Sequence, residues 1–294
     1  MKPHMKGIVL AAGGAGLWGG SGVAGQYLMQ NCGVDAAWLT DLRLLLGGLI
    51  LLAVDARQHG SGGISAIWCR RRNAVELLVF AVFGMLAVQY SYLASIAYGN
   101  APATTVIQYT MPAFVIIWTA LSSWRLPQRL EVICVIMAMA GTFVLVTHGS
   151  LETLSVPLLS VIWGFVSALA AALYTILPRR LIREWRSSLV VGWGMLVGGL
   201  LFLPAAQPWS IPGTWDWLTF GNFAYVIVLG TAAAFSFYLG SLRYLTSAEA
   251  GILGCLEPLS SIVFSVACLG TSFGLLDIVG TLLVVIPVFL LAKR

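Results

Sequence analysis

Long apolar segments separated by short polar ones dominate this chain of 294 residues. An apolar stretch of about 20 residues is long enough to cross the hydrocarbon core of a bilayer as a helix. Breaks at charged residues, at Gly, Pro and Asn clusters and at Trp-rich ends divide the chain into ten such stretches. They lie near residues 7–28, 34–54, 74–97, 102–122, 130–147, 156–177, 188–204, 219–242, 248–270 and 274–292. The pattern therefore predicts an all-α integral membrane protein with ten transmembrane helices.

Composition narrows the class further. Only 9% of the residues are charged and 59% are hydrophobic, whereas a soluble domain has about 25% charged residues. This excludes a cytosolic enzyme, a nucleic-acid-binding module, a disulfide-stapled secreted domain and a disordered chain. The apolar runs are continuous, which also excludes an outer-membrane barrel with its alternating strands. The five Cys residues have no metal-ligand or C-x-x-C spacing, so no metal site is expected.

The basic residues predict the orientation of the spans. With the N-terminus placed in the cytoplasm, all but one of the 16 Lys and Arg residues fall in cytoplasmic segments. The exception is Arg43, within the second span. Cytoplasmic loops of membrane proteins carry such an excess of Lys and Arg. Both termini are therefore expected in the cytoplasm.

The two halves of the chain resemble each other. A shift of 146 residues places Tyr98 on Tyr244, Pro112 on Pro258 and Glu131 on Asp277. We predict one five-helix repeat over 1–150 and a second over 151–294. Because five is odd, the second repeat would be inverted in the membrane. Inverted repeats are an architecture of secondary transporters with a site near the midplane, and a duplication that serves only packing is the alternative.

Several matched segments also carry a family resemblance. They are Leu17-Trp18-Gly19-Gly20-Ser21, Leu42-Arg43-Leu44, Ala101-Pro102, Tyr109-Thr110-Met111-Pro112 and Leu256-Glu257-Pro258-Leu259. Over nearly its whole length the chain resembles the drug/metabolite transporter superfamily, specifically the ten-helix EamA family. Within it, the chain is most similar to bacterial exporters of aromatic amino acids. The resemblance implies a multi-pass inner-membrane protein that exports small metabolites, with a central cavity lined by helices 1, 3, 4, 6, 8 and 9.

Three charged residues fall well inside predicted spans, away from the span ends, where each is costly. Glu257 lies near the middle of the span 248–270. It is a candidate for contact with a substrate amine or for carrying a proton. The alternative is a packing role in which it bonds a neighbouring hydroxyl or Trp N–H. Asp41 and Arg43 are two positions apart and point to different faces of one helix. Arg43 therefore needs a partner on another helix or a cavity, in a structural, gating or substrate-carboxylate role.

Two prolines occupy equivalent positions near the middle of their spans. Pro112 and Pro258 each remove a backbone donor and free the carbonyl four residues earlier, that of Gln108 and that of Gly254. A broken turn is tolerated in a membrane where it lines a cavity or finds a polar neighbour. We predict a pair of kinks or hinges beside a binding site, with plain packing kinks as the alternative.

Aromatic and amide side chains complete the candidate site. The residues expected to contact substrate, in addition to Glu257, are Trp18, Gln89, Tyr92, Gln108, Trp163, Tyr174 and Tyr238. Such a lining suits a planar ring by stacking or an organic cation by cation–π contact. For any one of these aromatics, filling of interhelical space is the simpler interpretation.

Missing motifs limit the function. The chain has no phosphate-binding G-x-x-x-x-G-K-[ST] sequence and no H-E-x-x-H. We expect no catalytic residues, no enzyme activity, no cofactor and no nucleic-acid partner. The prediction is a secondary active or facilitative transporter that exports aromatic amino acids by alternating access, with a small molecule and the lipid bilayer as its partners. The alternatives are a proton-coupled exporter of drugs or organic cations that uses Glu257, and an exporter of other neutral amino acids or metabolites.

Overall fold

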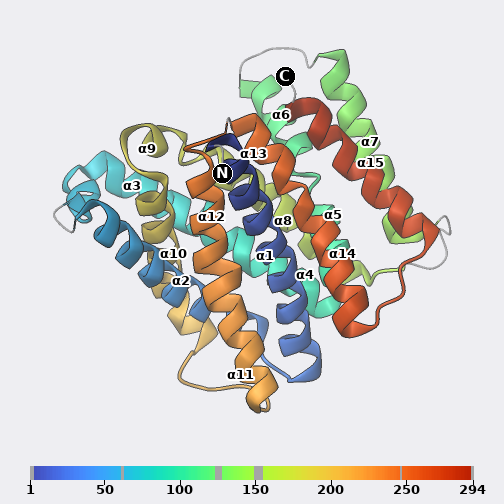
Figure 1. Ribbon diagram of the computed structural model, residues 1–294, viewed down its shortest axis with the longest axis horizontal. Helices are drawn as coiled ribbons and strands as arrows, with labels where there is room; N and C mark the ends of the chain where they lie inside the picture. The colour runs from blue at the N-terminus through green and yellow to red at the C-terminus, as the bar shows by residue number, and fades with distance from the viewer. Residues whose placement is uncertain (1–2, 61–62, 123–127, 149–154, 246, 293–294) are drawn as a thin grey trace.

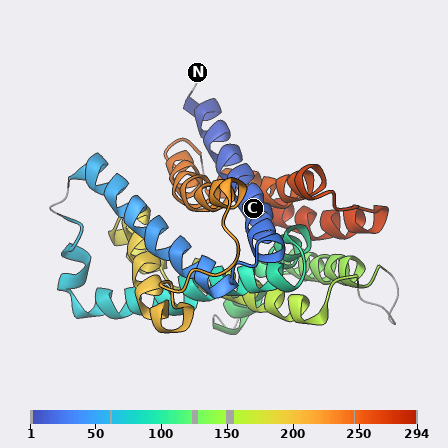
Figure 2. The ribbon, with the colours of Figure 1, turned by 90° about the horizontal axis from the view of Figure 1, so that it is seen from below.

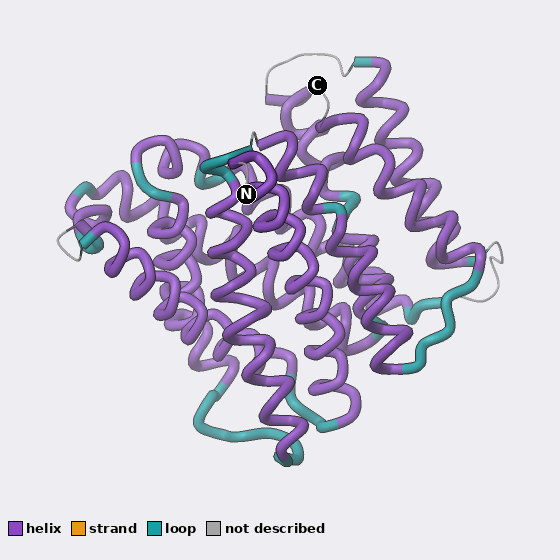
Figure 3. Tube along the Cα trace, viewed as in Figure 1, coloured by secondary structure: helices purple, strands orange, loops and turns teal. Residues whose placement is uncertain are grey.

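The fold is known from a computed structural model that describes residues 3–60, 63–122, 128–148, 155–245 and 247–292. Within these ranges every regular element is a helix (Figure 3), which confirms the predicted all-α class. The predicted boundary between the halves, at residues 150 and 151, lies outside the described residues. So do four of the basic residues used for orientation, namely Lys2, Arg125, Lys293 and Arg294.

The helices follow one another with short connections. The first half contains α1 (Pro3–Asn31), α2 (Ala36–His59), the 3-10 helix η2 (Ala66–Cys69), α3 (Arg71–Val79), the π-helix η3 (Phe80–Leu86), α4 (Ala87–Tyr98), α5 (Ala101–Gln108), α6 (Met111–Ser122) and α7 (Arg129–Thr147). The second half contains α8 (Leu158–Ile176), α9 (Arg179–Glu184), α10 (Ser187–Ala206), α11 (Trp217–Ala224), the π-helix η4 (Tyr225–Ala233), α12 (Ala234–Ser241), α13 (Ser247–Gly254), α14 (Leu256–Leu269) and α15 (Leu275–Ala292).

The helical segments match the predicted spans. Within the described part of the chain, nine segments are at least 18 residues long and apolar enough to cross a membrane, and a tenth, Leu275–Leu290, is apolar but shorter. The third and eighth segments each run through a π-helix without interruption. All ten predicted spans therefore correspond to helical segments.

Side-chain caps begin three helices on the face opposite the N-terminus. Asp35 accepts hydrogen bonds from two amides at the start of α2, Asn100 caps α5 and Asp216 caps α11. Such caps satisfy amides that have no partner within the helix. The hydrogen bonds from Thr219 hold the pKa of Asp216 below its usual range. The chain reversals on this face are thus encoded locally in the sequence.

Two helix pairs join the halves by close packing. Helix α2 packs against α10, and α7 packs against α15 near the opposite end of the molecule (Figures 1 and 2). A Cβ atom on Gly141 would lie 2.7 Å from the Gly280 carbonyl oxygen, and one on Gly280 would lie 2.8 Å from that of Gly141. Only glycine allows the backbones of α7 and α15 to approach so closely.

The remaining contacts between the halves are reciprocal. Helix α1 packs against α12 and α14, and α8 packs against α4 and α5. Two spans are interrupted, one between α5 and α6 at Tyr109 and the other between α13 and α14 at Cys255. The shift of 146 residues superimposes these two positions. Both interruptions lie beside the same central space.

Candidate functional site

A cavity of about 350 Å³ lies between the two halves. All six helices that the resemblance implies contribute to its lining, together with the second and tenth spans. The lining residues are Trp18, Arg43, Met85, Val88, Gln89, Tyr92, Gln108, Tyr109, Met111, Pro112, Ala171, Tyr174, Thr175, Phe235, Tyr238, Leu239, Gly254, Glu257 and Val288. The cavity therefore combines apolar and aromatic walls with one acidic and one basic side chain.

An aromatic cluster forms one wall. The ring of Trp18 lies 5.0 Å from that of Phe235 and 5.1 Å from that of Tyr238, measured between centroids. Phe80 packs behind Tyr174 at 5.5 Å. These separations fall within the range of favourable aromatic pairs. The rings pack edge-on or tilted against one another and form an aromatic wall of the cavity.

The two interrupted spans meet through a single phenol. The Tyr109 hydroxyl donates to the Gly254 carbonyl oxygen at 2.6 Å, and it lies 3.2 Å from a carboxylate oxygen of Glu257. Gly254 is one of the two residues whose carbonyl the proline positions leave without its helical donor. The Tyr109 hydroxyl satisfies that carbonyl and orients the acid at the cavity wall.

Close packing of α1 also fixes the position of Glu257. A Cβ atom on Gly19 would collide with the Ser260 hydroxyl and the Glu257 carbonyl oxygen. Glycine at this position lets the backbone of α1 rest on the first turn of α14. The acid is therefore held by backbone packing on one side and by Tyr109 on the other.

Arg43 is buried and has only neutral partners. Its Nε donates to Thr231 Oγ1 at 2.9 Å, and its Nη2 donates to the Gly230 carbonyl at 3.3 Å. Both acceptors belong to the π-helix η4, and π-bulges are frequent at functional sites. Among the described residues no carboxylate forms an ion pair with Arg43. A guanidinium has five N–H donors, so Arg43 keeps donors that can serve a ligand in the cavity.

Some amide and hydroxyl groups of the site form hydrogen bonds to neighbouring helices. The Gln108 side chain donates to Ser167 Oγ at 2.7 Å, and the Tyr92 hydroxyl is 2.8 Å from Thr105 Oγ1. Both groups are thereby held against the wall. Gln89 also lines the cavity, with 8% of its surface exposed.

Hydrogen bonds join four helices near the start of α5. The Gln26 side chain accepts from the Ala101 amide at 2.8 Å, and Gln30 donates to the carbonyls of Ile96 and Gly99. Next to them, Ser95 donates to the Ser160 carbonyl at 2.8 Å. On the other side the lining continues through residues near the ends of α8, α12 and α15. Polar contacts between α1, α4, α5 and α8 therefore hold these helices together at this end of the molecule.

Seven of the eight residues expected to contact substrate line this cavity, and the eighth, Trp163, does not. Trp163 packs edge-on against Tyr90, with ring centroids 5.5 Å apart. It shares a helical face with Tyr174 but precedes it by 11 positions in α8, a distance of about 16 Å along the helix axis. The helical periodicity gives the correct face and not the depth.

The intramembrane charges and the prolines also divide into residues that line the cavity and residues that do not. Arg43 and Pro112 line the cavity, whereas Asp41 and Pro258 do not. Asp41 is fully buried, and neither of its carboxylate oxygens has a hydrogen-bond partner among the described residues. Each proline stands in the first turn of a new helix, α6 or α14, a position that needs no N–H donor. The spans are thus broken into separate helices rather than only kinked.

Tyr109, Met111 and Phe235 line the cavity although they were not predicted as substrate contacts. The sequence holds a signal for two of them. Tyr109 directly follows Gln108 and precedes a membrane-embedded proline, and Phe235 lies one helical turn before Tyr238. Among the described residues no group of three metal-ligating side chains occurs.

Comparison with known proteins defines the class. The EamA-like transporter family matches residues 5–147 and again residues 158–293, so the chain belongs to this family. It is 40% identical over 296 residues to the "Uncharacterized inner membrane transporter YicL" of Salmonella typhimurium, covering 99% of this chain and 97% of that protein. It is 22% identical over 230 residues to the "Uncharacterized transporter YyaM" of Bacillus subtilis, covering 74% and 73%. The chain is accordingly a multi-pass transporter of the inner membrane.

A solved structure shares the fold. A crystal structure that is 16% identical in sequence matches with a TM-score of 0.62, covering 99% of this chain and 96% of that one. At this identity the match concerns the fold alone. The family and the named relatives confirm the predicted superfamily, and they leave the substrate to be inferred from the cavity.

Proposed function

We propose that the protein exports aromatic amino acids across the inner membrane by alternating access. The observation that carries the proposal is that one aromatic cavity contains both Arg43, a buried cation with no ion-pair partner among the described residues, and the acid Glu257. The cavity needs a ligand that complements both charges.

A zwitterion meets that need. Arg43 would bind the carboxylate, because its two protein partners are neutral and leave donors for a second acceptor. Glu257 would accept from the ammonium group, while Tyr109 keeps the carboxylate oriented. Burying an unpaired charge is costly, and a bound ligand with one charge of each sign relieves that cost at both ends.

The walls favour an aromatic side chain over an aliphatic one. Trp18, Phe235 and Tyr238 form a continuous ring surface beside Glu257. A well-placed aromatic pair adds about 0.5–1.5 kcal/mol beyond the burial of its surface. The volume of about 350 Å³ lies in the range of small-molecule sites. Gln89, Tyr92, Gln108 and Tyr174 complete the proposed contact surface.

Residues 1–150 and 151–294 would move as two inverted repeats around this site. Reciprocal helix packing and the matching interruptions at Tyr109 and Cys255 support this division. The hydrogen bonds at the start of α5 would form the gate that is closed in this state. With both termini in the cytoplasm, as the distribution of basic residues indicates, that gate faces the outside.

Counterflow in proteoliposomes tests the proposal. Vesicles preloaded with unlabelled tryptophan should accumulate labelled tryptophan, phenylalanine or tyrosine in a saturable and stereoselective manner. Empty vesicles and vesicles loaded with the D-enantiomer are the controls. Equal accumulation with and without preloaded substrate would contradict the proposal.

A second candidate is a proton-coupled exporter of organic cations. An acid among aromatic rings suits a cation by combining ion pairing with cation–π contact, and Glu257 would exchange the cation for a proton. In that case a cation without a carboxylate should drive counterflow at least as well as tryptophan does. Arg43 disfavours this candidate, because it places a second positive charge in the same cavity.

A further inference from the structure

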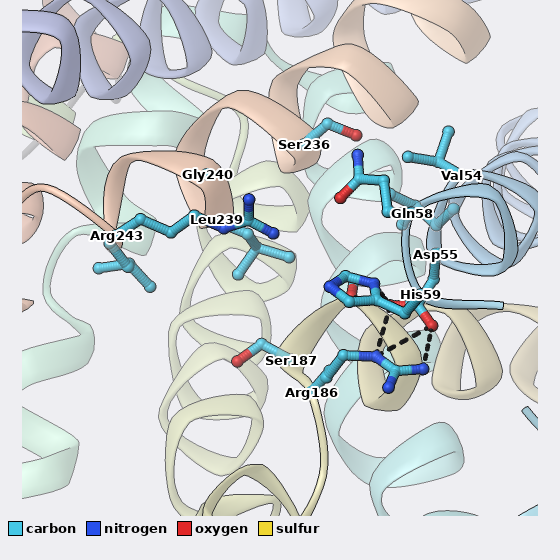
Figure 4. A pocket seen from close by; sticks show the side chains of 13 residues that line it. Val54, Asp55, Gln58, His59, Arg186, Ser187, Ser236, Leu239, Gly240 and Arg243 are labelled. Carbon is cyan, nitrogen blue, oxygen red and sulfur yellow. Dashed lines mark hydrogen bonds and ion pairs between the residues drawn. The ribbon is translucent and has the colours of Figure 1, made fainter. Parts of the chain in front are cut away.

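A second cavity of about 350 Å³ lies where α2 and α12 end and α10 begins. Figure 4 shows Arg243, Ser187, Gln58 and His59 around it. This face of the molecule also carries the N-terminus and is predicted to be cytoplasmic. Leu239 lines both this cavity and the central one. A single side chain therefore borders the two spaces.

The acid in this second cavity is already neutralised. Asp55 is 1% exposed and accepts from the Arg186 guanidinium through two nitrogens, with the shortest distance 2.6 Å. The Ser188 hydroxyl donates to the same carboxylate, and the Asp55 hydrogen bonds raise the pKa of Arg186. Such bidentate pairing leaves Asp55 little capacity to repel an anion.

Arg243 is the uncompensated charge of the second cavity. It is exposed at the end of α12, and its guanidinium reaches toward Leu239 in Figure 4. Among the described residues no Asp or Glu forms an ion pair with it. His59, whose side chain is 32% exposed, lies 3.5 Å from the Asp55 carboxylate and so faces the same acid as Arg186. The cavity therefore attracts anions.

We propose that this cavity is an entry vestibule that captures the carboxylate of small-molecule substrates through Arg243 and delivers them past Leu239 to the central site. The proposal rests on the proposed export of amino acids and adds a second binding position on the substrate path. A charge at the rim of a site acts mainly on the association rate and its dependence on salt. Arg243 thus selects for carboxylate-bearing cargo before the central cavity does.

Charged thiol reagents test the vestibule without relying on transport. In a background in which the exposed Cys69 and Cys268 are serine, Ser187→Cys would place a thiol in the cavity. An anionic methanethiosulfonate should modify it faster than a cationic one of similar size. Arg243→Gln should lower that anion-to-cation rate ratio about fivefold. Arg183→Gln is the matched control, because Arg183 is exposed on the same face and lines neither cavity.

Transport supplies the second readout. Arg243→Gln should raise the KM for tryptophan about threefold to fivefold, as expected for loss of an exposed ion pair, and leave Vmax unchanged. The KM of a decarboxylated amine, where it is carried, should not move. An unchanged rate ratio at Ser187→Cys in Arg243→Gln would overturn the vestibule, whether or not the protein transports amino acids.

Anionic lipid is the other source of a negative group at this face. The rate ratio is therefore measured in vesicles of phosphatidylcholine alone and with added phosphatidylglycerol. A ratio that is independent of phosphatidylglycerol supports a vestibule for substrate. If added phosphatidylglycerol removed the faster reaction of the anionic reagent, that result would overturn the vestibule in favour of a lipid site.

Discussion

The two interrupted spans share a backbone design and differ in chemistry. Each breaks at an equivalent position, Tyr109 in the first half and Cys255 in the second, and each restarts with a proline in the first turn of the new helix. The first break supplies a phenol and an amide, from Tyr109 and Gln108. The second supplies a carbonyl acceptor and an acid, from Gly254 and Glu257.

This comparison distinguishes the features that both repeats require, the helix breaks, from the features that substrate binding requires, the side chains. The break itself recurs because both halves must open a helix beside the cavity, where the exposed backbone can find partners. The side chains diverge because a single ligand presents different groups to the two halves. Cys255 stands where the first half has Tyr109, and a thiol is a weak donor. The Tyr109 hydroxyl, from the first half, is the donor that joins the two breaks.

The largest expected effect on substrate binding comes from a substitution at the second break. Glu257→Gln keeps the shape of the side chain and removes its charge, so it should reduce binding of aromatic amino acids about 30-fold or more, since loss of one partner of a buried charge pair costs about 2–5 kcal/mol. Scintillation proximity binding of labelled tryptophan measures this. Glu184→Gln, at an exposed acid outside the cavity, should leave binding unchanged. If Glu257→Gln bound tryptophan within twofold of the wild-type affinity, Glu257 would not contribute to substrate binding.

A smaller effect is expected on the first break. Tyr109→Phe removes the hydroxyl that bonds Gly254 and faces Glu257, and it should weaken tryptophan binding about fivefold to tenfold, in line with one hydrogen bond to a charged or buried group. Tyr98→Phe is the matched control, because Tyr98 is 52% exposed and lies outside the cavity. If Tyr109→Phe and Tyr98→Phe bind tryptophan equally well, the Tyr109 hydroxyl does not contribute to substrate binding.

The prolines allow a direct comparison of the halves. Pro258→Ala introduces an N–H that competes with the Tyr109 hydroxyl for the Gly254 carbonyl, so we expect counterflow to fall about fivefold. Pro112→Ala restores a donor at the first break without touching that bond and should reduce counterflow about twofold. Equal losses in the two variants would mean that the prolines act only through helix packing.

The smallest effect is expected at the buried acid outside the cavity. Asp41→Asn should leave the order of substrate preference unchanged, because Asp41 does not line the cavity. The melting temperature of the detergent-solubilised protein should rise, because Asp41 has no hydrogen-bond donor among the described residues and a buried carboxylate without a donor is costly. A lower melting temperature together with altered selectivity would instead make Asp41 part of the transport machinery.

Much of the fold was predictable from periodicity and charge alone. The spans follow from apolar length, and each one is a helix in the described residues. The matched prolines at 112 and 258 predicted two interruptions at equivalent depths. Their form was harder to predict, because whether a proline kinks a helix or begins a new one depends on tertiary partners such as the Tyr109 hydroxyl.

The site was predictable by residue type and less so by depth. Trp18, Tyr174 and Tyr238 were identifiable as aromatics inside spans, and Glu257 as a mid-span acid. Trp163 met the same criteria but lies outside the cavity. Residues that share one face of a helix point in the same direction, but the pattern does not show at which depth in the bundle the cavity lies. The neutral partners of Arg43 were also hidden, because they depend on the π-helix that turns the Gly230 carbonyl toward it.

The central claim is that one cavity binds both ends of a zwitterion, and an analogue series tests it most directly. Binding of tryptophan, tryptamine and indole-3-propionate is measured in the wild type, in Glu257→Gln and in Arg43→Gln. We expect the wild type to prefer tryptophan to both analogues about tenfold or more. Glu257→Gln should lose its discrimination against indole-3-propionate, and Arg43→Gln its discrimination against tryptamine. Tighter binding of tryptamine than of tryptophan by the wild type, unaffected by Arg43→Gln, would contradict the account.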